Sequence, residues 1–329
     1  MEVVIRIEHD SDVGVARRTA RETAVAAGLG EEDAGRAALV ATEAATNLAR
    51  HASSGAFFVR RLDPAEGHGI EMLAVDRGPG IANLANSMVD GVSTRGTPGQ
   101  GLGAIKRIAD LLTIDSRPGE GTIMVAQVRN GSTAPPLPMA VGGLTAAISS
   151  DGCGDAFAFA PKGHGLAVIM IDGLGHGADA AAAADAAVEC FHRRSTDDLV
   201  NLFQALDREL KPTRGAAIAI AHVAPSEKSV HFMGVGNISG ILISGGKARN
   251  MVSHNGIVGH TMRRVQQFDY PFEDGPTVIL HSDGIGTRWQ PMALVERGLT
   301  NPTAIAAQLW RSDARGRDDA GIVVARGLS

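Results

Sequence analysis

Aromatic residues make up only 4% of this 329-residue chain, and cysteine occurs only twice. Cys153 and Cys190 cannot build a disulfide framework, and no cluster of cysteine and histidine has the spacing of a zinc site. No apolar run reaches the ~18 residues that a membrane-spanning helix needs, since even residues 166–171 end at Asp172. The sequence opens without the basic and then apolar stretch of a signal peptide, so we expect a cytoplasmic protein.

An excess of positive charge is also missing. Lys and Arg total 31 and Asp and Glu total 36, which gives a formal net charge of -5. Up to residue 130 there are 14 basic and 17 acidic side chains, which leaves 17 and 19 for the remainder. Neither part has the composition of a nucleic-acid-binding domain, and we expect neither nucleic acid nor a membrane as a partner.

What is present is the composition of a globular protein. Hydrophobic residues make up 44% and charged residues 20%, and with so few aromatics the cores must be aliphatic. The length predicts two domains, at ~100–200 residues per domain. Periodicity disappears at residues 130–138, where Pro, Gly and small polar residues accumulate. We therefore expect a domain at residues 1–130, a linker at 131–143 and a second domain at 144–329.

The pattern of elements differs between the two domains. The first reads as two helices, two strands, a glycine-rich loop that leads into a helix, and a last strand, which favours an α/β sandwich. Its helices are expected at residues 11–27, 31–50 and 102–111, and its strands at 56–62, 70–76 and 122–128. The second reads as many short strands with longer helical stretches. Its strands are expected at residues 166–171, 216–223, 229–233, 238–243, 277–281 and 322–325, and its helices at 178–193, 199–210 and 303–312.

Glu43 and Asn47 are the first candidate site residues. They are four residues apart, so on a helix they share one face, where a carboxylate and an amide can position water and a hard cation together. Taken alone, such a pair is more often a pair of solvated helix residues. The pair becomes informative only in combination with glycine motifs later in the chain.

Two glycine-containing motifs stand after this pair in order. Asp76 ends a predicted strand and precedes Gly78 and Gly80, where a backbone can approach a flat group closely. Gly101 and Gly103 stand at the start of a predicted helix, where free amides and the helix dipole favour phosphate. Each motif by itself is an ordinary turn or a weak glycine loop.

In this order the motifs resemble the N box and glycine boxes of the GHKL (Bergerat-type) ATPase superfamily, over about residues 10–128. Gly121 and Thr122 match the later glycine-threonine element of that superfamily. Within it the sequence is most similar to the anti-sigma-factor serine kinases of the RsbT-like type, which share the stretch at residues 90–94. The segment between Gly80 and Gly101 is short and has Arg95 as its only cation, so the resemblance implies a minimal nucleotide lid.

The resemblance implies a role for each matching residue. Glu43 would be the general base, Asn47 the magnesium ligand and Asp76 the carboxylate that binds adenine. The cofactors implied are ATP and magnesium. The remaining contacts to ATP would come from Gly78, Gly80, Gly101, Gly103 and Thr122.

The second domain repeatedly places acids at strand ends beside glycine. Asp155, Asp172, Asp283 and Asp318 all stand at such junctions. One Asp-Gly turn is ordinary, but four separated carboxylates at strand ends are costly unless a cation gathers them. Two hard divalent ions about 3.5–4 Å apart would do so, and they could clamp a phosphoryl group.

This set resembles the PPM-type serine/threonine phosphatases of the SpoIIE branch, over about residues 145–327, and is most similar to the RsbX-like type. The resemblance implies that Asp155, Asp172, Asp283 and Asp318 bind two magnesium or manganese ions, together with the carbonyl of Gly173. It also implies an α/β (α+β) chain, in which an N-terminal Bergerat-type ATPase α/β sandwich precedes a PPM-type αββα phosphatase sandwich.

Some positions stay open between two interpretations or depart from the family pattern. Asp319 competes closely with Asp318 as the last ligand, and His176 either orients a bound water or phosphate or packs as a turn histidine. Asn237 follows glycine where many relatives have Gly-His-Asn, and Gly321 replaces a common hydroxyl residue.

We therefore expect a bifunctional partner-switching regulator with a serine/threonine kinase domain and an opposing phosphatase domain. By resemblance the substrates are STAS-domain antagonist proteins in sigma-factor or stressosome signalling. Two alternatives stay open: a first domain that only binds ATP and docks or activates a phosphatase, and one that sequesters a sigma factor directly.

Overall fold

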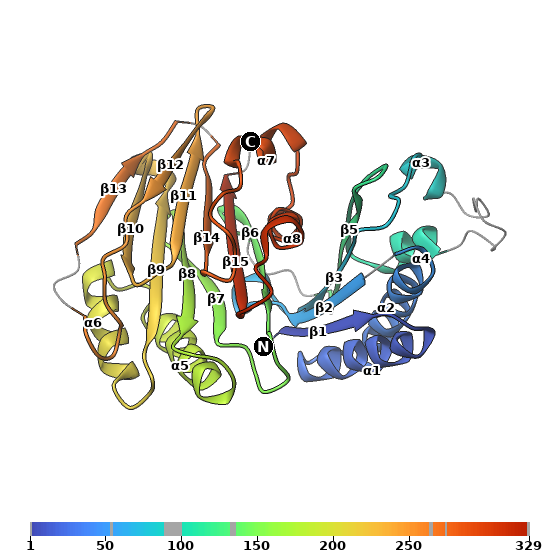
Figure 1. Ribbon diagram of the computed structural model, residues 1–329, viewed down its shortest axis with the longest axis horizontal. Coiled ribbons are helices and arrows are strands. Elements are labelled where there is room, and N and C mark those ends of the chain that lie inside the picture. Colours follow the sequence, from blue (N-terminus) through green and yellow to red (C-terminus); the bar gives the residue numbers. More distant parts are fainter. Residues whose placement is uncertain are drawn as a thin grey trace. The chain divides into compact units, whose positions relative to one another are not determined.

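The computed structural model describes residues 2–52, 55–88, 101–131, 136–262, 266–273 and 275–327 (Figure 1). The chain divides into two compact units, Met1–Pro135 and Pro136–Ser329. No helix in the described ranges is long and apolar enough to cross a membrane.

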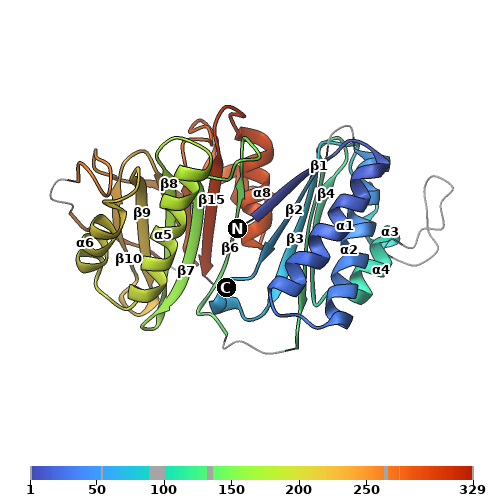
Figure 2. The same cartoon turned by 90° about the horizontal axis from the view of Figure 1, so that it is seen from below.

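The first unit is built on one antiparallel sheet of five strands, in the order β1-β2-β3-β5-β4. Helices α1, α2 and α4 lie along one of its faces, with α1 and α2 side by side (Figures 1 and 2). The strands are β1 (Glu2–Ile7), β2 (Gly55–Arg61), β3 (Gly69–Asp76), β4 (Leu111–Arg117) and β5 (Gly121–Arg129). The helices are α1 (Asp10–Ala26), α2 (Glu31–His51), α3 (Leu84–Ser87) and α4 (Gly101–Ile108), with a 3-10 turn η1 (Pro64–Glu66).

Alanine stripes explain why α1 and α2 pack closely. Ala16, Ala20 and Ala24 recur at helical spacing on α1 and are fully buried, as are Ala37 and Ala41 on α2. Small side chains let two helices approach closely while keeping the helix propensity high. The long helices expected from the sequence are therefore confirmed to within a few residues.

The helix expected at residues 102–111 is partly wrong. It ends at Ile108, and β4, which the sequence pattern did not predict, begins at Leu111. The Asp110 carboxylate accepts a hydrogen bond from the Arg129 amide at 2.7 Å, which attaches this turn to β5. Pairing with β5 outweighs the helix propensity of the following residues.

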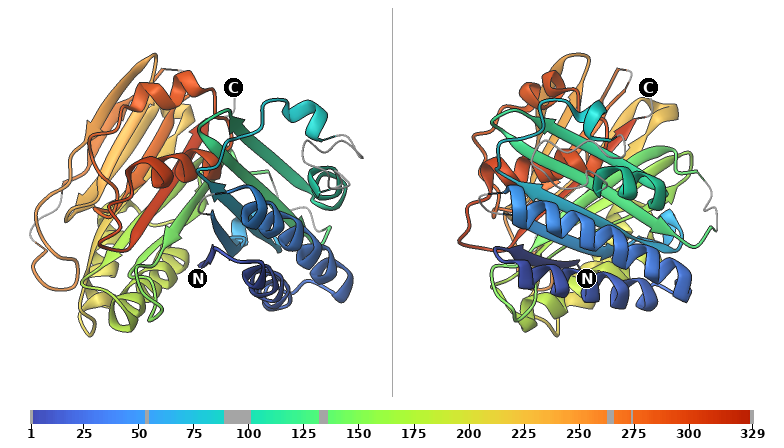
Figure 3. Two further views of the ribbon diagram at one scale, coloured as in Figure 1. Left: turned by 45° about the vertical axis from the view of Figure 1, so that its right-hand side comes forward. Right: turned by 90° about the vertical axis from the view of Figure 1, so that its right-hand side faces the viewer.

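The second unit stacks two five-stranded antiparallel sheets between helices (Figures 1 and 3). Helices α5 and α6 pack against the outer face of one sheet, and α8 packs on β6 and β15 of the other. The result is an αββα sandwich. One sheet has the order β13-β10-β9-β8-β7 and the other β12-β11-β14-β15-β6. The strands of the first sheet are β7 (Asp155–Lys162), β8 (Gly165–Gly173), β9 (Ala216–Ala224), β10 (Ser229–Val235) and β13 (Phe268–Pro271). Those of the second are β6 (Met139–Ala146), β11 (Ser239–Ser244), β12 (Lys247–Met251), β14 (Thr277–His281) and β15 (Ala320–Gly327). The helices are α5 (Ala178–Arg194), α6 (Leu199–Leu210), α7 (Pro291–Arg297) and α8 (Pro302–Asp313), with a 3-10 turn η2 (Pro225–Glu227).

Strand β6 begins inside the segment assigned to the linker, which therefore ends earlier than residue 143. Met139 is the first residue of β6, which pairs with β15 along its length. Gly142 and Gly143 interrupt its apolar pattern, so the strand is not recognised in the sequence. A β-carbon at Gly142 would lie 2.3 Å from the Thr303 hydroxyl of α8, so Gly142 permits close packing of the helix on the sheet. A β-carbon at Gly143 would instead lie 2.3 Å from the Ile322 carbonyl of β15.

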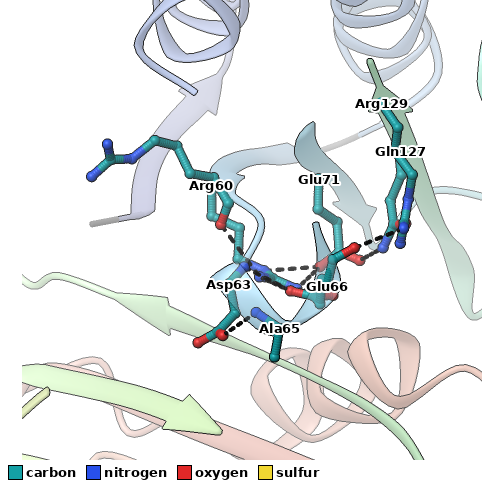
Figure 4. Close-up of polar contacts among 8 residues, drawn as sticks. Arg60, Asp63, Ala65, Glu66, Glu71, Gln127 and Arg129 are labelled. Carbon is teal, nitrogen blue, oxygen red and sulfur yellow. Dashed lines mark hydrogen bonds and ion pairs between the residues drawn. The ribbon is translucent and has the colours of Figure 1, made fainter. Parts of the chain in front are cut away.

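The sheet of the first unit carries a buried ionic network on the face opposite its helices (Figure 4). Arg60 pairs with Glu66 at 2.9 Å and with Glu71 at 2.8 Å. Gln127 donates to Glu71 at 2.7 Å, and its own carbonyl accepts from Arg129 at 2.7 Å. Burial disfavours the guanidinium charge, but Glu66 and Glu71 raise the pKa of Arg60 above its ordinary value. The network joins β2, β3, β5 and η1.

Replacing Arg60 with Met should destabilise the first unit strongly, because Glu66 and Glu71 would then be buried without a cation. We expect Arg60→Met to cost about 3 kcal/mol of unfolding free energy. The matched control is Arg21→Met, which breaks the exposed Arg21–Glu31 pair and should cost less than about 1 kcal/mol. Hydrogen exchange of the β2 and β3 amides measures both, and equal protection in the two variants would contradict the prediction.

Candidate ATP site and candidate metal centre

Helix α2 presents Glu43 and Asn47 to the first residue of α4. Both side chains are half-buried on one face of α2. A β-carbon placed at Gly101 would lie 3.0 Å from Glu43 Oε2 and 3.6 Å from Asn47 Oδ1. A side chain at residue 101 would crowd these two groups, so the carboxylate, the amide and the start of the helix lie close together.

Asp76 and the two glycines after it form a tight loop at the end of β3. The Gly78 amide donates to Asp76 Oδ1 at 2.6 Å. A β-carbon at Gly78 would lie 2.6 Å from the His51 carbonyl at the end of α2. Gly80 has a φ of +70°, and a β-carbon there would lie 2.0 Å from the Arg117 carbonyl. The loop therefore lies against α2, the helix that carries Glu43 and Asn47.

The β4–β5 hairpin holds this loop in place. Thr122 Oγ1 lies 2.8 Å from Ser116 Oγ, and Ser116 Oγ accepts from the Ile81 amide at 2.8 Å. The Gly119 amide donates to the Pro79 carbonyl at 2.8 Å. Sequence reasoning missed Ser116 because it missed β4, although alternating apolar residues at 112 and 114 mark that strand.

The Asp76 loop and the start of α4, which carry predicted ATP residues, thus both lie against α2. Gly103 is buried within α4. The start of a helix, with a neighbouring amide and carboxylate, suits a nucleotide phosphate with a magnesium ion. Residues 90–94 and Arg95 lie outside the described residues.

In the second unit, Asp155 and Asp172 stand directly opposite each other on β7 and β8. Asp283 follows β14, and Asp318 precedes β15, which is paired with β14. Gly173 is adjacent, since a β-carbon at Gly154 would lie 3.3 Å from its carbonyl oxygen. The strand ends of both sheets therefore meet at these acids.

Burial, reinforced by mutual repulsion, dominates the electrostatics of this cluster. Burial and the charge of Asp172 hold the pKa of Asp155 well above its ordinary value. Burial, Asp283 and Asp318 raise the pKa of Asp172 to about 7. Carboxylates that resist ionisation in this way are stabilised by a nearby cation.

The donor set fits hard divalent ions. Among the described residues, no three side chains of His, Cys, Asp or Glu form a ready-made metal cage. Magnesium does not require one, because it keeps several waters and takes only one or two carboxylates directly. Dispersed carboxylates with a backbone carbonyl among them, as at Gly173, are compatible with that chemistry.

Two neutral side chains orient the carboxylates. Ser282 Oγ donates to Asp155 Oδ2 at 2.5 Å and accepts from the Gly321 amide at 3.0 Å. Asn237 Nδ2 donates to Asp283 Oδ2 at 2.8 Å. Sequence reasoning missed Ser282 and noted Asn237 only as a departure, because such contacts join strands distant in sequence.

The neighbouring acids Asp318 and Asp319 have different surroundings. Asp319 is buried and accepts the amides of Ile148 at 2.7 Å and Gly154 at 2.6 Å. Asp318 is exposed, and its Oδ1 accepts the amide of Asp319 at 2.9 Å. Both oxygens of the Asp319 carboxylate thus accept hydrogen bonds from backbone amides, which favours Asp318 as the metal ligand. The assignment of Asp318 stays a prediction.

Gly321 departs from the family pattern for a packing reason. A β-carbon there would lie 2.0 Å from Met170 Cε and 3.1 Å from Asp155 Oδ2. Met170 fills the space that a side chain at 321 would need. A hydroxyl reaches Asp155 from Ser282 instead.

His176 is exposed on the loop between β8 and α5, whose glycines Gly175 and Gly177 have positive φ. Arg214 lies against this loop, because a β-carbon at Gly175 would be 3.2 Å from its Nη1. Arg214 also pairs with Asp179 in the first turn of α5 at 2.5 Å. This cation at the loop after β8 was not predicted from the sequence.

Two families match the chain. Residues 8–127 match the family described as Histidine kinase-like ATPase domain, and residues 162–326 match Stage II sporulation protein E (SpoIIE). The chain belongs to the SpoIIE family. The SpoIIE match includes Asp172, Asp283 and Asp318 and begins after Asp155. A kinase-like ATPase domain therefore precedes a PPM-type phosphatase domain, as the two resemblances implied.

The chain is also similar to individual proteins. The Serine/threonine-protein kinase RsbT of Bacillus subtilis (strain 168) is 34% identical over 118 residues, which cover 36% of this chain and 89% of that protein. A solved structure described as "The bacterial stressosome: a modular system that has been adapted to control secondary messenger signaling" has a TM-score of 0.54 at 29% identity, and the match covers 57% of this chain and 99% of that one. RsbX in complex with magnesium has a TM-score of 0.52 at 16% identity, covers 66% and 99% respectively, and shares the fold.

The raised pKa of Asp172 predicts how stability depends on pH in chelator-treated protein. Below about pH 4, Asp172 is protonated in both the folded and the unfolded states, so it adds no pH dependence. As the pH rises from about 4 to about 7, the unfolded state releases this proton first and stability falls, and the loss is complete above the folded-state pKa of about 7. In calorimetry, metal-free Asp172→Asn should therefore be more stable than the wild type at about pH 8 and equal to it near pH 4.

Asp198→Asn is the contrasting control. The Asn201 amide lowers the pKa of Asp198, so that its charge stabilises the folded state above its ordinary pKa, and the variant should lose stability at about pH 8. Equal pH profiles for Asp172→Asn and the wild type would contradict the electrostatic assignment.

Ser282 should matter for metal affinity, because it fixes the orientation of Asp155. We expect Ser282→Ala to weaken manganese binding, measured by calorimetric titration, by about 10–100-fold. Ser282→Thr keeps the hydroxyl and should retain most of the affinity. Wild-type affinity in Ser282→Ala would show that this hydrogen bond does not position a ligand.

Proposed function

We propose that this chain is a bifunctional partner-switching regulator that works in the cytoplasm. Its first unit is an ATP-dependent serine/threonine kinase, and its second is a metal-dependent phosphoserine/phosphothreonine phosphatase. The substrates are STAS-type antagonist proteins in sigma-factor or stressosome signalling. The observation that carries the proposal is the position of Glu43 beside Asn47 at the start of α4, on the same chain as the acids opposed on β7 and β8.

In the kinase unit, Glu43 accepts the proton of the partner's hydroxyl group, and Asn47 holds the magnesium ion of ATP. Asp76 accepts a hydrogen bond from the adenine amine. Gly78 and Gly80 let the adenine ring lie close to the backbone. Amides at the start of α4 bind phosphate. The match over 89% of the length of a protein named as a serine/threonine kinase supports this assignment.

In the phosphatase unit, two magnesium or manganese ions would supply charge neutralisation and an activated water when bound. Asp155, Asp172, Asp283 and Asp318 would hold them, with the carbonyl of Gly173. Ser282 and Asn237 keep two of these carboxylates in position through the contacts described above. The exposed His176 and Arg214 are available at the loop to contact a phosphorylated partner.

Glu43→Gln tests the kinase assignment. The change keeps the size of the side chain but removes the base, so phosphate transfer from magnesium ATP to a STAS protein should fall by about 10²–10⁴-fold. ATP binding, measured by calorimetry, should remain. The assay uses the Asp172→Asn background, so that the phosphatase does not remove the product.

The matched control is Asp172→Asn alone, which should retain phosphate transfer and lose dephosphorylation. Transfer at the wild-type rate in Glu43→Gln would exclude Glu43 as the base. ATP binding without any transfer, in every variant, would instead favour the docking alternative.

A further inference from the structure

Arg36 is a half-buried arginine of α2 that the assigned functions do not use. Its guanidinium donates to the Ile108 carbonyl through Nη2 at 2.6 Å and through Nε at 3.2 Å. The same group donates to Asp110 Oδ1 at 2.8 Å and to Asp33 Oδ1 at 2.8 Å. Ile108 is the last residue of α4, so Arg36 holds the C-terminal end of that helix.

The opposite end of α4 lies at the candidate ATP site. Glu43 follows Arg36 by seven positions on α2, and Ile108 follows Gly101 by seven positions on α4. Both intervals span about 10 Å at a rise of 1.5 Å per residue. The two helices therefore run antiparallel with matched contacts, Arg36 on Ile108 at one end and Glu43 beside Gly101 at the other.

The anchor at Arg36 is tied to the sheet as well. Asp110 accepts from Arg36 through Oδ1 and from the Arg129 amide of β5 through Oδ2 at 2.7 Å. Between the two ends of α4, Ile105 is fully buried in the core that also contains Val40 of α2. Sliding of α4 along α2 would break the Arg36 contacts before it disturbed this apolar packing, because hydrogen bonds are directional and apolar contact is not.

We propose that Arg36 is a positioning residue for ATP. It fixes the position of α4 along α2, so that the amides at the start of α4 lie next to Glu43 and Asn47. This inference rests on the proposed kinase site. Arg36 lies at the far end of α4 and touches no nucleotide itself. Its contribution is confined to the phosphate end of the ligand, because the adenine end is held by the Asp76 loop and the β4–β5 hairpin.

The test compares two ligands, magnesium ATP and adenosine, by calorimetric titration of the full chain. Arg36→Gln should weaken binding of magnesium ATP about tenfold and leave adenosine affinity unchanged. Arg36→Lys keeps the charge but cannot donate to Ile108 and Asp110 in the same fork, so it should give a partial loss. Arg21→Gln, which removes an exposed ion pair between α1 and α2, is the matched control and should leave both affinities unchanged.

Each outcome decides the inference. Selective loss of ATP affinity supports it, and equal loss for both ligands would overturn it, because a purely structural clamp would weaken the whole site. Unchanged ATP affinity in Arg36→Gln would overturn it as well and leave the kinase site intact. If the wild-type chain bound no magnesium ATP, the proposed function itself would fail, which is a distinct result.

Discussion

The cost of ionising carboxylates that are both buried and close together is the constraint on which the candidate site of the second unit depends. Asp155 and Asp172 face each other across two paired strands, in a place where ionised acids are costly. Neutral donors offset part of that cost, through Ser282 on Asp155 and Asn237 on Asp283. The Asp319 carboxylate accepts hydrogen bonds from two amides of the loop before β7, and so helps to hold the acids near one another. An energetically strained arrangement of this kind is the usual mark of a functional site.

The elements predicted well from sequence are those in which local preference and burial agree. Helices α1, α2, α5 and α6 have periodic apolar faces, and the central strands β8 and β9 are continuous apolar runs. Several strands at the sheet edges were missed because they lack such signals. The exposed residues of β12 and the glycines of β6 are examples, since their strand conformation depends on pairing with a neighbour.

The same distinction applies to the sites. Glu43, Asn47 and Gly101 stand in short motifs that can be recognised in the sequence, and the structure brings them together, while their roles stay predictions. Other residues could not be recognised from the sequence, because each contacts a residue far away in the chain. They are Ser282, Asn237, Ser116 and Arg214. A serine beside an aspartate is common in any sequence, and only tertiary structure shows that this one donates to a different acid.

The pairing of β6 with β15 also has a consequence for biosynthesis. The first unit is contiguous, so all of its described strands are synthesised before β6. The second unit has its first strand paired with its last, and the Asp319 contacts to the loop before β7 wait for the same late segment. Because domains fold as units during synthesis, the ATPase-type domain can mature on the nascent chain while the acids of the other domain are still unassembled.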